Sequence, residues 1–147
     1  MKTNSIILFF LSTLFLFSAC KKDKETDNSQ ITIARLQGKW EATKFTEKIY
    51  EVQNNKLVSE KTTPYPANER SIEYKGSEIL YYRNQTLQNT YTYAVIGNEI
   101  RIREGNQGFY FQFKFYSDTQ HSHIEESYYK SNTIEMKEVT ETYYNKN

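Results

Sequence analysis

The chain has 147 residues, with 19 Lys and Arg against 18 Asp and Glu, and 16% of its residues are aromatic. A near-neutral chain is not expected to bind nucleic acid, because neutralising phosphates takes a surplus of basic residues. Five glycines and two prolines exclude collagen-like and low-complexity classes, and the aromatic content is too high for a disordered chain. The length suits one domain behind a targeting segment.

The amino terminus has the form of a cleavable signal. Lys2 precedes an apolar run over residues 6–17, which is too short to cross a bilayer because a spanning helix needs about 20 residues. The run ends in Phe17-Ser18-Ala19-Cys20, and Cys20 is the only cysteine. This ending resembles the lipobox of bacterial lipoproteins. The alternative is an ordinary secretory signal beside an unrelated cysteine.

The lipobox resemblance implies that residues 1–19 are removed and that Cys20 carries acyl chains in the outer membrane of a Gram-negative bacterium. Loss of Lys2 leaves 18 basic and 18 acidic residues, a mature net charge of zero. Residues 20–30 are expected to form a charged, flexible tether, because they offer nothing apolar to bury after the cysteine. The Lys-and-acid run also resembles the export signals of surface lipoproteins in Bacteroidota, which implies exposure on the cell surface.

Residues 31–147 are expected to form one all-β domain. A single helical turn is predicted over residues 31–36, with Ser29 before it as a candidate N-cap. Nine extended segments follow, separated by turn residues, and Gly97-Asn98 is the strongest hairpin signal. Short connections favour antiparallel neighbours, so the pattern predicts a meander of hairpins. The nine segments are 44–52, 56–62, 71–74, 78–83, 90–96, 99–103, 109–116, 122–130 and 133–144.

The clearest strand pattern lies in residues 109–116, where phenylalanines occupy the odd positions and more polar residues the even ones. Since successive side chains point to opposite faces, one face of this strand is wholly aromatic. Residues 99–103 alternate in the same way. Strands with one dry face and no helical layer to cover it require a barrel or a sandwich, and we expect an up-and-down barrel of about eight strands. The candidates for its interior, or for a ligand cavity in it, are Ile100, Ile102, Phe109, Phe111, Phe113 and Phe115.

Gly38-Lys39-Trp40, at the head of the first strand and after the helical turn, resembles the first signature of lipocalins and their shorter bacterial relatives. The resemblance implies an eight-stranded barrel whose closed end is covered by Trp40, with Gly38 where the chain passes close beneath it. A second Thr-Asp-Tyr signature is missing. Lipocalins also place a late arginine on the tryptophan, and here Lys130 or Lys137 is the expected substitute.

No catalytic motif or phosphate-binding loop is present, so we expect no enzymatic activity and no cofactor. The one cluster of metal-ligating residue types is His121-Ser122-His123-Ile124-Glu125. Its two imidazoles and its carboxylate would share one face of a strand, which could suit a cation. A solvated strand face explains the same pattern, and the sequence favours that interpretation over a metal site.

Two functions remain. The first is a non-catalytic binding module that takes a small apolar or amphipathic molecule into the barrel. The second is a cell-envelope interaction protein with a solid barrel, which binds protein or glycan through its outer face or loops. Eight strands leave room either for a filled core or for one small ligand, so strand number does not separate the two.

Overall fold

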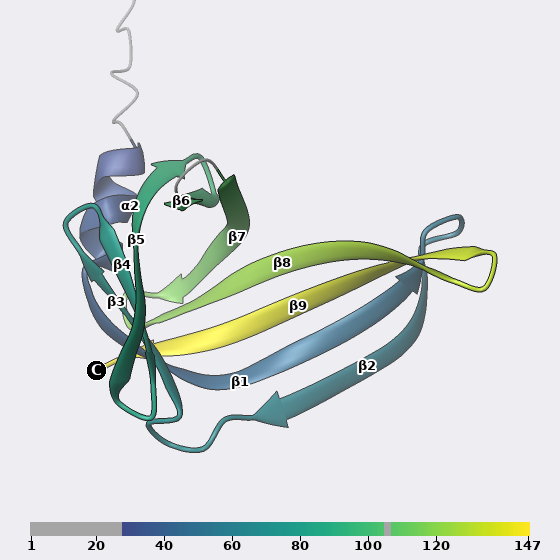
Figure 1. Ribbon diagram of the computed structural model, residues 1–147, viewed down its shortest axis with the longest axis horizontal. Helices are drawn as coiled ribbons and strands as arrows, with labels where there is room; N and C mark the ends of the chain where they lie inside the picture. Colours follow the sequence, from purple (N-terminus) through teal and green to yellow (C-terminus); the bar gives the residue numbers. More distant parts are fainter. Residues whose placement is uncertain (1–27, 105–106) are drawn as a thin grey trace, which may run out of the picture.

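The computed structural model describes residues 28–104 and 107–147, apart from the side chains of residues 28–31, 104 and 107 (Figure 1). The predicted signal and Cys20 lie outside the described residues. In the part that is described, helix α2 (Asn28–Leu36) precedes the strands, so residues 28–30 of the predicted tether are helical. The strands are β1 (Gly38–Glu51), β2 (Lys56–Pro64), β3 (Arg70–Lys75), β4 (Glu78–Arg83), β5 (Thr86–Ile96), β6 (Glu99–Glu104), β7 (Gln107–Ser117), β8 (Gln120–Ser131) and β9 (Ile134–Lys146).

Eight of the strands close one antiparallel sheet into a ring. From β3 to β9 each strand pairs with the next, and β1 joins the ends of this series by pairing with β3 and with β9. Strand β2 pairs with β1 alone and stands outside the ring. The prediction of an all-β meander of nine antiparallel strands is therefore confirmed. The described helix is too short to span a membrane, and no other described segment is a helix that could.

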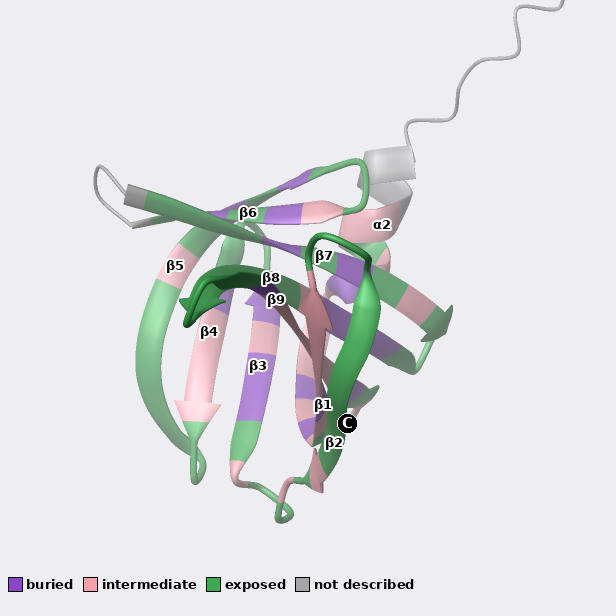
Figure 2. Ribbon diagram, turned by 90° about the vertical axis from the view of Figure 1, so that its right-hand side faces the viewer, coloured by how far each residue is buried: buried purple, intermediate pink, exposed green. Residues whose placement is uncertain are grey.

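Three ring strands, β1, β8 and β9, continue beyond the ring and form an arm together with β2. The arm comprises residues 44–51, 56–64, 125–131 and 134–140 (Figure 1). Strand β7 pairs with β8 only as far as Ile124, whereas β9 follows β8 to Ser131. Along the same length β1 exchanges its partner β3 for β2. Figure 2 looks along the arm towards the ring and shows β2 and the tip of β8 exposed, while β3 carries buried residues.

Side chains from most of the ring strands fill its interior. Trp40, Tyr74, Ile79 and Phe111 are each at most 2% exposed. Among the six candidates for the interior, Ile100, Ile102, Phe111 and Phe113 are buried, Phe115 is half-buried and Phe109 is 45% exposed. The register of β6 and β7 places these side chains on the same face, because Ile100 pairs with Phe111 and Ile102 with Phe109.

Helix α2 covers one end of the ring. Buried Leu36 accepts a hydrogen bond from the indole Nε1 of Trp40 at 2.6 Å. Gly38 has a φ of 108°, which favours glycine, and a Cβ there would lie 3.3 Å from Cε of Lys146. The end that carries α2 is called the closed end below.

The cation above the tryptophan is Lys146, whose Nζ lies 5.0 Å from the ring of Trp40. The expectation that Lys130 or Lys137 takes this place is wrong. Both lie on the arm, where Nζ of Lys137 is 5.4 Å from the ring of Tyr50 and the backbone of Lys130 stands opposite Glu135 in the register of β8 and β9. Lys146 takes this place because β9 runs from the tip of the arm back to Trp40, so its last residues reach the closed end.

Candidate functional site

The two histidines lie in the core, so the interpretation of this segment as a solvated strand face is wrong. His121 is 0% exposed and His123 is 3% exposed. They share the inner face of β8 because His121 pairs with Phe115 and His123 with Phe113. The sequence does not reveal that these histidines are buried, because Ser122 between them is also polar and buried, so the segment shows no alternation of apolar and polar residues.

The imidazoles form part of a dry polar chain. Oη of Tyr74 lies 2.7 Å from Nε2 of His123, which lies 3.1 Å from Nε2 of His121. Aromatic rings enclose this chain, with Phe111 stacked on His123 at 4.0 Å and Trp40 edge-on to His121 at 4.2 Å. Nδ1 of His121 has no hydrogen-bond partner among the described residues.

Burial keeps both imidazoles neutral. It lowers the pKa of His121 to about 3, with a smaller contribution from the charge of Lys146. It also lowers the pKa of His123 well below its usual value. No group of three His, Cys, Asp or Glu side chains within the described residues is placed to hold a metal ion. Their burial and their hydrogen bonds make the two histidines part of the core.

The end of the ring opposite α2 contains a cleft of about 440 Å³, which we call the mouth cleft. It lies where the arm leaves the ring, between β1, the β2–β3 connection, β8 and β9. The β2–β3 connection is the Pro-Tyr-Pro break of the sequence, held to β1 by the amide of Tyr65, which donates to the carbonyl of Thr43 at 2.9 Å. The lining residues are Phe45, Thr63, Pro64, Tyr65, Glu69, Arg70, Glu125, Thr140 and Thr142.

Aromatic rings and a guanidinium form one side of the mouth cleft. The rings of Phe45 and Tyr65 are tilted against each other with centroids 5.3 Å apart. The guanidinium of Arg70 lies 5.2 Å from the centroid of Tyr65. Burial raises the pKa of Tyr65, so its hydroxyl is protonated at neutral pH.

Two polar groups of the mouth cleft are poorly solvated. Oγ1 of Thr63 is buried and has no hydrogen-bond partner in the described part of the chain. Glu125 is exposed as a whole residue, but its carboxyl group is partly buried, and this burial raises its pKa. An unpaired buried hydroxyl costs about 1–3 kcal/mol, but solvent does not reach this oxygen, so the polar contact that the cleft offers is the carboxyl of Glu125.

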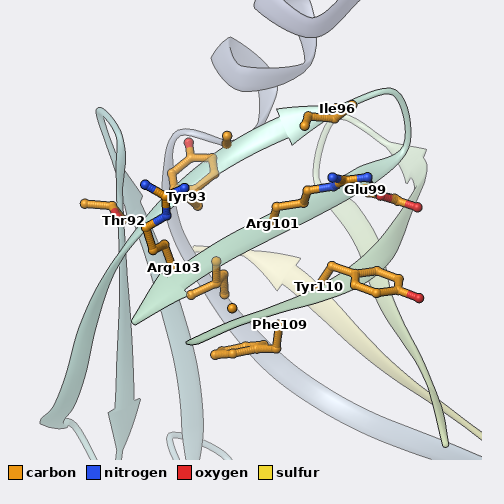
Figure 3. A pocket seen from close by; sticks show the side chains of 11 residues that line it. Thr92, Tyr93, Ile96, Glu99, Arg101, Arg103, Phe109 and Tyr110 are labelled. Atoms are coloured by element: carbon orange, nitrogen blue, oxygen red, sulfur yellow. Dashed lines mark hydrogen bonds and ion pairs between the residues drawn. The ribbon is translucent and has the colours of Figure 1, made fainter. Parts of the chain in front are cut away.

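A second, broader hollow of about 1080 Å³ lies along β5, β6 and β7, and we call it the outer depression (Figure 3). Cross-strand registry places Ala94, Arg101 and Tyr110 in one row. Small side chains at Ala94 and Gly108 leave room beside the arginines. Arg101 is committed to Glu99, to which its guanidinium donates two hydrogen bonds at 2.9 and 3.1 Å.

One outward carboxylate is already saturated. Glu141 accepts hydrogen bonds from Tyr116 and Ser122 at 2.6 Å and from Tyr143 at 2.8 Å. Burial alone would raise the pKa of Glu141, but these three hydrogen bonds outweigh it and lower the pKa. Because three of its about four acceptor positions are occupied, this carboxylate is a structural link between β7, β8 and β9.

No family model, curated protein or solved structure matches the chain. Sequence reasoning missed Phe45, Tyr65 and Arg70 as possible ligand contacts, although the Pro64-Tyr65-Pro66 break marked the connection that carries one of them. The six candidates of β6 and β7 contribute Ile102 and Phe109 to the outer depression and none to the mouth cleft.

Proposed function

We propose that the protein is a lipid-anchored, lipocalin-like barrel of the bacterial outer membrane that binds a small amphipathic molecule without catalysis. The mouth cleft is the observation that supports this proposal. Its volume of about 440 Å³ falls within the range of about 300–1,000 Å³ that is usual for small-molecule sites. The binding position is the mouth of the barrel, because side chains such as Phe111 and Ile100 already fill the interior.

The lining of the mouth cleft suits a molecule with an apolar face and a polar edge. The tilted rings of Phe45 and Tyr65 offer a surface for stacking. Arg70 can donate to an anionic or hydroxyl group, and Glu125 can accept from a donor. A sugar ring or an aromatic acid carries groups of both kinds.

The anchor in this proposal is Cys20, which the lipobox resemblance identifies. Helix α2 begins at Asn28, eight residues after the cysteine. Eight fully extended residues span at most about 28 Å. The barrel would therefore stay close to the bilayer, and two or more acyl chains would hold it there stably.

Binding of a protein or glycan through the outer face is the second candidate function, and the outer depression is the observation that favours it. Tyr110 is 64% exposed, Ile96 is 52% exposed, and both line it together with Arg101 and Arg103. Tyrosine and arginine are enriched at protein interfaces.

Binding of 8-anilinonaphthalene-1-sulfonate, an anionic aromatic dye, separates the two sites. We expect the dye to bind the wild-type protein with increased fluorescence, and Tyr65→Ala or Arg70→Ala to weaken binding at least about tenfold through lost stacking and charge. Tyr110→Ala and Arg103→Ala are the matched controls in the outer depression and should leave binding unchanged. Thermal unfolding of each variant verifies its fold.

The reverse pattern, in which only Tyr110→Ala and Arg103→Ala weaken binding, would move the site to the outer depression and support the second function. Loss of binding in neither pair, or equal loss in both, would contradict a ligand site in the mouth cleft.

A further inference from the structure

Strand β8 carries a free backbone edge along the arm. Its partner β7 ends its pairing at Ile124, and no other described strand pairs on that side from Glu126 onwards. Every residue of 125–131 is exposed, including Tyr128 at 62% and Tyr129 at 40%. Figure 1 shows this edge of β8 running on beyond the end of β7.

Hydrogen bonds of β9 determine which backbone groups of β8 point outwards. The carbonyl of Glu135 accepts from Val52 on the β1 side, whereas the amide of Lys146 donates to Thr119 on the β8 side. Backbone groups alternate in direction along a strand. Even-numbered residues of β9 therefore bond to β8, through odd-numbered partners such as Ser127 and Tyr129. The amides and carbonyls of the even-numbered residues of β8, Glu126, Tyr128 and Lys130, are left facing outwards.

We propose that this edge pairs with the same edge of a second copy of the chain, antiparallel and centred on Tyr128. A two-fold axis there places Tyr128 opposite the partner's Tyr128, and Glu126 opposite the partner's Lys130 on both sides of the axis. All three are outward-bonding positions, so each pair would exchange two N–H···O bonds, about six in total. The dimer would join two four-stranded arms into one sheet.

Charge supports this register. Glu126, Tyr128 and Lys130 are alternate residues, so their side chains share one face of the arm. Opposite charges directly across a strand pair are stabilising, and this register creates two such pairs. Lys130 makes no ion pair with any described residue. The carboxylate of Glu126 accepts from the hydroxyl of Tyr128 at 3.2 Å and lies 3.7 Å from Nζ of Lys137, which leaves lone pairs for a further donor.

The other free edge of the arm, on β2, does not allow the same pairing. Its outward-bonding residues are Glu60 and Thr62, because Ser59 and Lys61 pair with β1 residues that face β2. A two-fold axis at Glu60 sets like carboxylates opposite each other, and an axis at Lys61 does the same for ammonium groups. An axis at Thr62 sets Glu60 opposite Pro64, which has no N–H. Prolines, lysines and bulges are the usual protections of an edge strand, and β2 also has a bulge opposite Ile49 and Tyr50.

A ladder of five residues is smaller than a standard stable interface, so we expect weak association. Sedimentation velocity of the full chain, in detergent micelles that outnumber the protein, measures it from about 10 µM to 1 mM. We expect concentration-dependent dimers of the wild type. Glu126→Lys, which sets two pairs of like charges across the interface, should weaken dimerisation at least about tenfold.

Two variants make the test specific. The exchange Glu126→Lys with Lys130→Glu restores both opposite-charge pairs and should return the dissociation constant to within about threefold of the wild type. Glu60→Lys is the matched control, because it makes the same charge change on the β2 edge and also removes an exposed ion pair, with Lys48. It should leave dimerisation unchanged.

Amide hydrogen exchange is a second measurement. At high concentration the amides of Tyr128 and Lys130 should exchange more slowly, whereas that of Ser127, already bonded to β9, should not change. The proposal is wrong if the wild type stays monomeric, if Glu60→Lys weakens the dimer as much as Glu126→Lys, or if the charge exchange fails to restore it. These outcomes are independent of ligand binding at the mouth cleft.

Discussion

His121 and His123 are the only histidines of the chain, and both are neutral in an aromatic core. A buried imidazole with a lowered pKa binds fewer protons in the folded state than in the unfolded state. The contribution of the neutral histidines to the free energy of unfolding is therefore complete above the unfolded pKa, near 6.5. It is lost as the pH falls from there towards the folded pKa, which is about 3 for His121.

Urea unfolding at pH 7.0 and 5.5 tests this linkage. Each histidine should remove roughly 1 kcal/mol of stability between these pH values, so the wild type should lose about 2–3 kcal/mol. His121→Gln should be less stable at both pH values but show about half of the pH dependence. Equal stability of the wild type at pH 7.0 and 5.5 would contradict two buried neutral imidazoles.

Strand β7 shows how a single face varies along one element. Its four phenylalanines share the inner face, but only the middle pair is buried. Phe111 is 2% exposed and stacks on His123, whereas Phe109 is 45% exposed. Phe115 lies near the closed end beneath the guanidinium of Arg35, whose Cζ is 4.0 Å from the ring centroid. The central residues of β7 are therefore expected to contribute most of the stability that this strand provides.

Alanine substitutions along β7 should follow this gradient in the free energy of unfolding. Phe111→Ala should cost about 3–5 kcal/mol, because it opens a cavity in the packed core. Phe109→Ala should cost less than about 2 kcal/mol, since part of its ring already contacts solvent. Tyr110→Ala, on the outer face, is the control and should cost less than about 1 kcal/mol.

Chemical denaturation of the three variants measures these differences. If Tyr110→Ala proved the most damaging of the three, the assignment of the inner and outer faces of β7 would be reversed.

At the scale of the whole molecule, the two ends of the ring differ. Helix α2, Trp40 and Lys146 cover the closed end, from which the chain leads back to Cys20. The mouth cleft lies at the other end, where the arm begins. An anchor at Cys20 would thus attach to the closed end and leave the mouth cleft on the opposite side of the ring.

Cys20→Ser tests the anchor. Without the thiol no acyl chain can be attached, so metabolic labelling with a fatty acid should give no labelled protein, and the first nineteen residues should not be removed by the lipoprotein route. Ser18→Ala, which keeps a small residue before the cysteine, is the control and should remain labelled. Label that persisted in Cys20→Ser would exclude this residue as the site of acylation.

Local patterns in the sequence identified all nine strands but not all of their bounds, because the first strand begins at Gly38 and not at residue 44. Alternation with a period of two identified the inner residues Ile100 and Phe111, and residues that tolerate positive φ identified most turns, with Gly97 at 62°. The bounds of one turn were predicted wrongly, because β5 begins already at Thr86. The turn before it is formed by Asn84 and Gln85, which have φ values of 48° and 64° although neither is a glycine. Both signals act over a few residues, so the sequence alone carries them.

Only the tertiary structure decided how far each pairing extends and what meets inside the ring. The arm exists because β9 follows β8 beyond Ile124 while β7 does not. Lys146 reaches Trp40, and the histidines enter the core, through registers between strands that are distant in the chain. The mouth cleft likewise combines the β2–β3 connection with β8 and β9. Such contacts depend on the closure of the whole sheet, because a shift of one residue in register would turn every side chain to the other face.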